Sequence, residues 1–106
     1  MSREVIDITE ASVLSVMRNH RKISIEAYAV GDPEKVEILI DIDILLREAN
    51  LTDRQMQIVE LYFMEQRTQE QTAEVLGITQ QAVGDQLTII KRRIKEVARK
   101  WGEMDA

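Results

Sequence analysis

Six apolar residues near the C-terminus recur at helical spacing and constrain the fold more than any other feature of the sequence. Their successive separations are 4, 3, 4, 3 and 4 residues, in the order Val83, Leu87, Ile90, Ile94, Val97 and Trp101. This spacing places all six along one face of an α-helix. A small three-helix domain would cover only the first half of such a stripe. The second half therefore requires another partner, either the N-terminal segment or another chain.

Capping residues divide the preceding sequence into further helices. Asp32 precedes Pro33, a pair that suits the N-cap and the first position of a helix, and we expect this helix to reach about Ala49. A second helix is expected from about residue 53 to 65, and a third from about 69 to 76. Gly77 supplies the backbone that ends helices at low cost. A fourth and longest helix is expected over about residues 80–101, followed by a frayed tail.

The first 31 residues have the least regular pattern of apolar residues, so their secondary structure is the hardest to predict. The run KISIEAYAV alternates like a strand but also fits a helix. We favour a helix, because a single strand would have nothing to pair with. The predicted fold class is therefore all-α, a small helical bundle with residues 1–50 as an N-terminal helical segment that mediates assembly.

The expected helix over 36–49 is apolar on more than one face. It is either buried centrally or packed against a second subunit. The residues that we expect to form a contact between subunits are Val36, Leu39, Ile40, Ile42 and Leu46.

Small and apolar residues around Gly77 indicate how the third and fourth helices meet. Ala73 is small where two helices approach closely, and Gly77 accepts the geometry of the turn. Ile78 and Val83 fill the angle between the helices. This combination is typical of a helix-turn-helix. We expect the third helix to bury Thr72, Ala73, Val75 and Leu76.

The runs LTDRQMQIVELYF and TQEQTAEVLGITQQAV, followed by spaced aliphatic residues, resemble region 4 of bacterial sigma factors. The matching positions are Leu51, Arg54, Gln55, Val59, Tyr62, Glu70, Ala73, Leu76, Gly77, Ile78, Thr79, Val83 and Leu87. The resemblance covers about half the chain and implies a helix-turn-helix DNA-binding domain over 51–106 that ends in a long recognition helix. Small phage and prophage transcription regulators carry a similar half. A complete sigma factor is not expected.

The resemblance implies a DNA-reading face on the last helix. Its residues are Gln80, Gln81, Gly84, Asp85 and Thr88, with Thr79 and the helix amides suited to a phosphate. Residues expected on the DNA backbone are Lys91, Arg92, Arg93 and Lys95. Sigma factors are richer in arginine on the reading face. Because Gly84 and Asp85 depart from that pattern, we expect modest affinity per monomer, increased by a dimer or larger homo-oligomer.

Charge distribution supports a local rather than a general affinity for nucleic acid. The chain has a net charge of −5, yet residues 86–101 carry six Lys or Arg and one Glu. Such a stripe attracts phosphate locally, while the acidic remainder suppresses indiscriminate binding. A solvated helix face explains the stripe about equally well.

Other classes of protein find little support in the sequence. His20 is the single histidine, there is no cysteine, and no nucleotide-binding or metal-ligand motif is present. We therefore expect no enzyme activity, no cofactor and no metal site. No apolar run reaches membrane-spanning length, and the start, MSREVIDITE, lacks the layout of a secretion signal. We expect a cytoplasmic protein.

The preferred interpretation is a phage-like transcription regulator that binds double-stranded DNA as a homo-oligomer. RNA polymerase is a further candidate partner, because sigma region 4 contacts it. Two alternatives share the same fold. One is a DNA-recognition subunit of a viral packaging machine, similar to a small terminase, which would form a ring. The other is a protein-interaction adaptor that does not bind DNA.

Overall fold

The computed structural model describes residues 10–105, and every regular element in that range is a helix. The prediction of an all-α bundle is confirmed. In chain order the elements are α1 (Glu10–Arg18), α2 (His20–Tyr28), α3 (Pro33–Glu48), α4 (Asp53–Ile58), the π-helix η1 (Val59–Met64), α5 (Gln69–Leu76) and α6 (Gln80–Asp105). The first nine residues, which bear on the expectation about secretion, lie outside this range.

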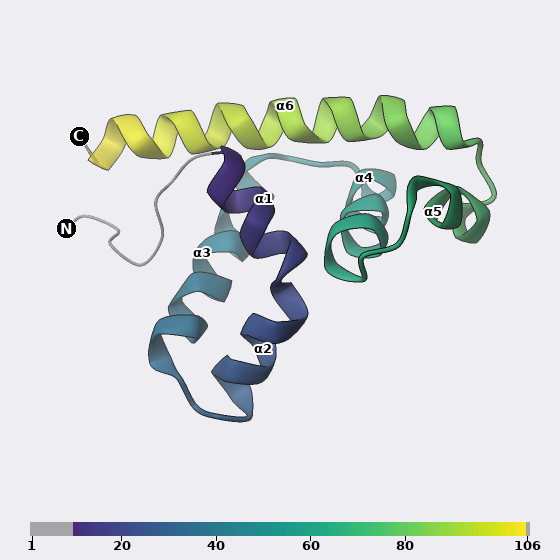
Figure 1. The fold of residues 1–106 in the computed structure, drawn as a ribbon. Coiled ribbons are helices and arrows are strands. Elements are labelled where there is room, and N and C mark those ends of the chain that lie inside the picture. The colour runs from purple at the N-terminus through teal and green to yellow at the C-terminus, as the bar shows by residue number, and fades with distance from the viewer. Residues whose placement is uncertain (1–9, 106) are drawn as a thin grey trace.

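Helix α6 runs along one side of the whole molecule. Its 26 residues span about 39 Å at 1.5 Å per residue, close to the longest dimension of 43 Å. In Figure 1 the other labelled helices all lie on one side of α6. Helices α1 and α3 pack under its C-terminal half, and α4 and α5 pack under its N-terminal half. Within residues 10–105, no labelled helix lies on the opposite side of α6 in Figure 1.

The apolar stripe of α6 is buried from end to end, with every member at most 7% exposed. Its second half is covered by the N-terminal segment of the same chain, since Val13, Met17 and Leu45 belong to the same core. The Trp101 indole N–H also donates to the Glu48 carboxylate of α3. The helix continues to Asp105, so the expectation of a frayed tail after Trp101 is wrong.

Helices α2 and α3 form an antiparallel hairpin that projects away from α6 (Figure 1). The expectation of a helix for KISIEAYAV is confirmed over residues 22–28. Gly31 takes the positive φ of +82° that the turn requires. The Asp32 side chain then accepts a hydrogen bond from the Glu34 amide, with Pro33 at the first helical position, as the capping pair predicts.

Helix α3 lies between α2 on one flank and α1 and α6 on the others, which explains its apolar residues on several faces. Ile42 and Leu46, both expected to contact a second subunit, are buried in the core of their own chain. Intramolecular packing accounts for these two residues. Val36 and Leu39 are half-buried, and Ile40 is 52% exposed.

The first helix of the C-terminal half differs from the single helix expected over 53–65. After α4 the chain widens into η1, in which Glu65 donates to the Glu60 carbonyl, five residues back. Gln66 follows with a φ of +57°. Helix α5 has the expected bounds and buries Thr72 and Ala73, but Val75 is 55% exposed. Val75 follows Ala73 by two residues and therefore points to the opposite side of the helix.

Within residues 10–105, no helix combines the length and the apolar character that crossing a membrane requires.

Candidate nucleic-acid interface

The turn between α5 and α6 has the packing that the small residues predict. Gly77 adopts a left-handed conformation with φ of +67°. The Ile78 amide donates to the Ala73 carbonyl at 3.1 Å, and the Gly77 amide donates to that of Glu74 at 3.4 Å. These two bonds form a Schellman motif, which ends α5 sharply. Ala73 and Val83 are buried at the crossing of the two helices.

Thr79 begins α6 as predicted. Its hydroxyl oxygen accepts a hydrogen bond from the Ala82 amide at 3.0 Å and so caps the helix. The hydroxyl proton is left to donate to a phosphate. The amides of the first helical turn point the same way and add the positive end of the helix dipole.

A second line of residues runs along α6 on the side opposite the buried stripe, and we call it the outer ridge. Each member precedes a stripe residue by two positions, which is a rotation of about 200° around the helix. All six are exposed: Gln81, Asp85, Thr88, Arg92, Lys95 and Arg99. Because the buried stripe faces the other helices, the outer ridge on the opposite side of α6 faces away from them.

The chemistry of the outer ridge changes along its length. Its first half presents an amide, a carboxylate and a threonine, whose hydroxyl donates to the Gly84 carbonyl at 3.2 Å. Its second half presents three cations. Arg99 pairs with Glu103 at 3.4 Å, whereas Arg92 and Lys95 have no ion pair within residues 10–105. The ridge therefore combines the kinds of side chain that contact bases in protein–DNA complexes with the kinds that contact phosphates.

Several predicted DNA contacts lie away from the outer ridge. Gln80 is exposed beside it, but Gly84 faces α5, and a Cβ atom there would lie 3.4 Å from Gln69 Oε1. Lys91 and Arg93 lie half-buried on opposite flanks of α6. The Arg93 guanidinium donates to the Asn50 carbonyl at 3.2 Å, where α3 joins α4. Of the run 91–93, only Arg92 is on the ridge.

Two other residues that sequence analysis placed at a helix start have internal roles. Gln55 is buried, completes a capping box with Thr52, and donates to Gln86 on α6 at 3.0 Å. Arg54 donates to the Leu76 carbonyl at 3.3 Å. Both hold the helix-turn-helix together. Arg99 is a ridge residue that was not among the predicted DNA contacts, although its seven-residue distance from Arg92 continues the ridge spacing.

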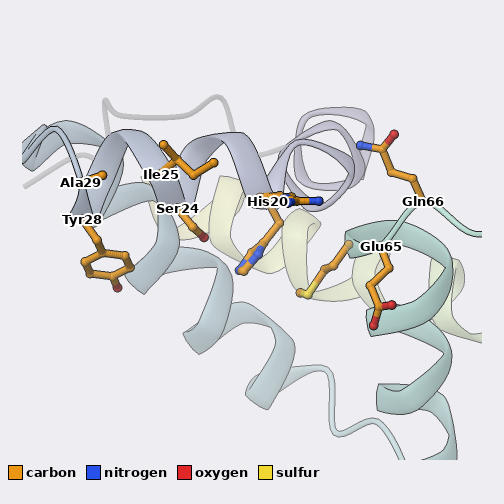
Figure 2. A pocket seen from close by; sticks show the side chains of 9 residues that line it. His20, Ser24, Ile25, Tyr28, Ala29, Glu65 and Gln66 are labelled. Carbon is orange, nitrogen blue, oxygen red and sulfur yellow. The ribbon is translucent and has the colours of Figure 1, made fainter.

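An open groove of about 940 Å³ lies elsewhere, between α2 and the end of η1. In Figure 2, His20, Ser24 and Tyr28 project from α2 towards the opening, and Glu65 and Gln66 come from the opposite wall. The groove includes no residue of α6. Within the described residues, no group of three or more His, Cys, Asp or Glu side chains is arranged to hold a metal ion.

The C-terminal half of the chain matches a known protein family. Residues 49–100 match the family described as sigma-70, region 4. The match covers α4, η1, α5 and α6 as far as Lys100, and leaves α1, α2 and α3 outside it. No curated protein and no solved structure matches the chain.

Proposed function

Residues 49–100 of the chain are a sigma-70 region 4-like helix-turn-helix, and from this we propose that the protein is a double-stranded DNA-binding transcription regulator of phage type, acting as a homo-oligomer. The observation that carries the proposal is the outer ridge. A 26-residue helix has one exposed face that begins with Gln81, Asp85 and Thr88 and continues with three cations. Two of these cations, Arg92 and Lys95, have no ion pair within residues 10–105. We propose the cytoplasm as its compartment, and a role in binding rather than catalysis.

In this proposal the N-terminal half of α6 reads bases in the major groove. Gln80 and Gln81 suit the paired donor and acceptor of adenine, and Asp85 suits the amino group of cytosine. The Thr88 methyl group suits the methyl group of thymine. Thr79 and the first amides of α6 bind a phosphate and fix the register of the helix on the duplex.

The C-terminal half of the ridge contacts the sugar-phosphate backbone through Arg92 and Lys95. Lys91 and Arg93 reach the DNA backbone only from the flanks of α6. Arg93 would do so while its guanidinium donates to the Asn50 carbonyl. A reading face with no arginine supplies limited affinity per subunit. Two subunits on adjacent half-sites double the contacts without changing the face, so we propose a homo-oligomer as the active form. RNA polymerase is proposed as a second partner, on the family resemblance alone.

Selection of bound sequences from a random duplex pool, followed by fluorescence anisotropy, tests this function. The Gln81→Ala variant is expected to change the preferred sequence, because it removes a base contact. The Arg92→Ala variant is expected to weaken binding to all sequences alike and to lower the salt dependence by about one counterion. Arg47→Ala is the matched control, since Arg47 is exposed on α3 and pairs with Asp43. Equal effects of Arg92→Ala and Arg47→Ala would refute the assignment of the ridge.

The same measurements separate the alternatives. If the chain forms a ring of many subunits in solution, the function is that of a viral packaging subunit and not of a transcription regulator. If the chain does not bind a duplex at low salt, the function is that of a protein-interaction adaptor with the same fold.

A further inference from the structure

Exposed apolar side chains gather on the α2–α3 hairpin. Five large hydrophobic residues in the described range are exposed, and four of them belong to the hairpin: Ile25 at 54%, Tyr28 at 72%, Val30 at 76% and Ile40 at 52%. The fifth, Val75, lies on α5. All four hairpin residues lie outside the segment that matches sigma-70 region 4. The family domain therefore does not explain them.

Three of these residues follow one another along α2 and the turn after it. Ile25 and Tyr28 line the open groove shown in Figure 2, together with Met64 from η1. Ile25 also lines a second hollow of about 420 Å³, beside Lys22 and Glu26. Exposed apolar surface bordered by polar residues marks a site of protein interaction.

Charge is unevenly distributed along the same hairpin. On the α2 side of the base of the hairpin, residues 18–22 carry Arg18, Arg21 and Lys22 and no acidic residue. On the α3 side of the base, Asp43 pairs with Arg47, and Glu48 accepts a hydrogen bond from Trp101. The tip of the hairpin, residues 26–37, carries four Asp or Glu residues and one lysine, and that lysine pairs with Glu26 at 3.9 Å. The Arg18 guanidinium is held over the Phe63 ring at 5.6 Å. Arg21 and Lys22 at the base, and Glu34 at the tip, have no ion pair within residues 10–105.

We propose that the hairpin is the self-association surface of the protein and that its partner is the hairpin of a second copy, in a two-fold antiparallel arrangement. Along α2 the surface passes from the basic base through Ile25 to a tip in which Tyr28 and Val30 lie among acidic residues. A two-fold axis near Ile25 places the base of each hairpin against the tip of the other and the apolar residues against each other. Such a surface is complementary to itself. A duplex has no apolar surface to cover Tyr28 and Val30, and the acidic tip would repel it.

This inference rests on the homo-oligomer in the proposed function and assigns its contact to α2 and the tip rather than to the buried residues of α3. Sedimentation of the full chain without DNA tests it. Tyr28→Ser is expected to raise the dissociation constant of the dimer at least tenfold, since an exposed tyrosine at the centre of an interface is a common hot spot. Val75→Ser removes a comparable exposed side chain from α5 and is expected to leave that constant unchanged.

A charge exchange tests the antiparallel pairing itself. Arg21→Glu alone and Glu34→Lys alone are each expected to weaken the dimer, because each places like charges opposite each other. An equimolar mixture of the two variants is expected to dimerise again, because each reversed charge then meets its opposite. Both residues are exposed, and far-UV circular dichroism checks that each variant is folded.

The outcomes separate this inference from the proposed function. A wild-type chain that is monomeric at all concentrations overturns both the oligomer and the hairpin contact. A wild-type dimer that is unaffected by Tyr28→Ser, or a mixture that fails to restore the dimer, overturns the hairpin contact alone. Duplex binding is measured separately, so its loss would overturn the DNA-binding role and leave the hairpin contact standing.

Discussion

Glycine residues in this chain illustrate how the same residue has different consequences at different positions. Gly77 takes a left-handed backbone that ends α5 and opens the turn to α6. Gly102 lies inside α6, where an added Cβ atom would meet nothing within 4 Å. Gly84 also lies inside α6, where the nearest atom to such a Cβ is the side-chain oxygen of Gln69. Only the first of these conformations favours glycine on backbone grounds.

The Gly77→Ala variant is expected to lose about 1–2 kcal/mol of unfolding free energy, because an L-residue is strained at a φ of +67°. The Gly102→Ala control is expected to gain about 0.5–1 kcal/mol, because alanine is the better helix former. Urea unfolding followed by far-UV circular dichroism measures both. A loss for Gly102→Ala that matched the loss for Gly77→Ala would contradict this account of the turn.

At the scale of elements, α6 serves two purposes with two lines of residues. The buried stripe holds the helices of the chain together. The residues of the outer ridge, each two positions before a residue of the stripe, face outward. The stripe is longer than a helix-turn-helix needs, and its last turns pack on α1 and α3. Trp101 closes this packing through its bond to Glu48.

The Trp101→Ala variant is expected to lose about 3–5 kcal/mol of unfolding free energy, since it removes a buried indole and leaves a cavity. Lys100→Ala, at an exposed neighbouring position, is expected to change it by no more than about 0.5 kcal/mol. Chemical denaturation of the full chain gives both values. Similar losses in the two variants would mean that the end of α6 is not packed against the N-terminal helices.

Local signals made much of the element order predictable. Asp32-Pro33, Thr52 and Gly77 act within a few residues of themselves, so the helix ends that they define agree with the structure. The widening of η1 depends on how α4 meets the rest of the core, and no local residue pattern signals it. The position of Arg93 was missed because a run of three cations was treated as one patch, whereas a helix turns by about 100° per residue.

At the scale of the whole molecule, the helices share one hydrophobic core. Buried residues from α1, α3, α4, η1, α5 and α6 form a single cluster, which includes residues of both the predicted N-terminal segment over 1–50 and the predicted domain over 51–106. The family match begins at residue 49, yet the second half of α6 depends on helices before it. The position of the ridge is therefore set by both parts of the chain.

Thermal unfolding is expected to be a single cooperative transition. Far-UV circular dichroism reports all the helices, and the fluorescence of Trp101 reports the junction between α6 and α3. Coincident midpoints for the two signals are expected for one shared core. Two separated midpoints would show that the N-terminal helices unfold independently of the helix-turn-helix.

In the proposed function, the outer ridge binds DNA through phosphate contacts and base contacts. Fluorescence anisotropy of the full chain with a random duplex, titrated from low to moderate salt, measures these contacts. Binding is expected at low salt, with log affinity falling linearly against log salt concentration and with a slope reduced by about one in Arg92→Ala. Absence of binding at the lowest salt, or binding that does not change with salt, would refute DNA binding by the outer ridge.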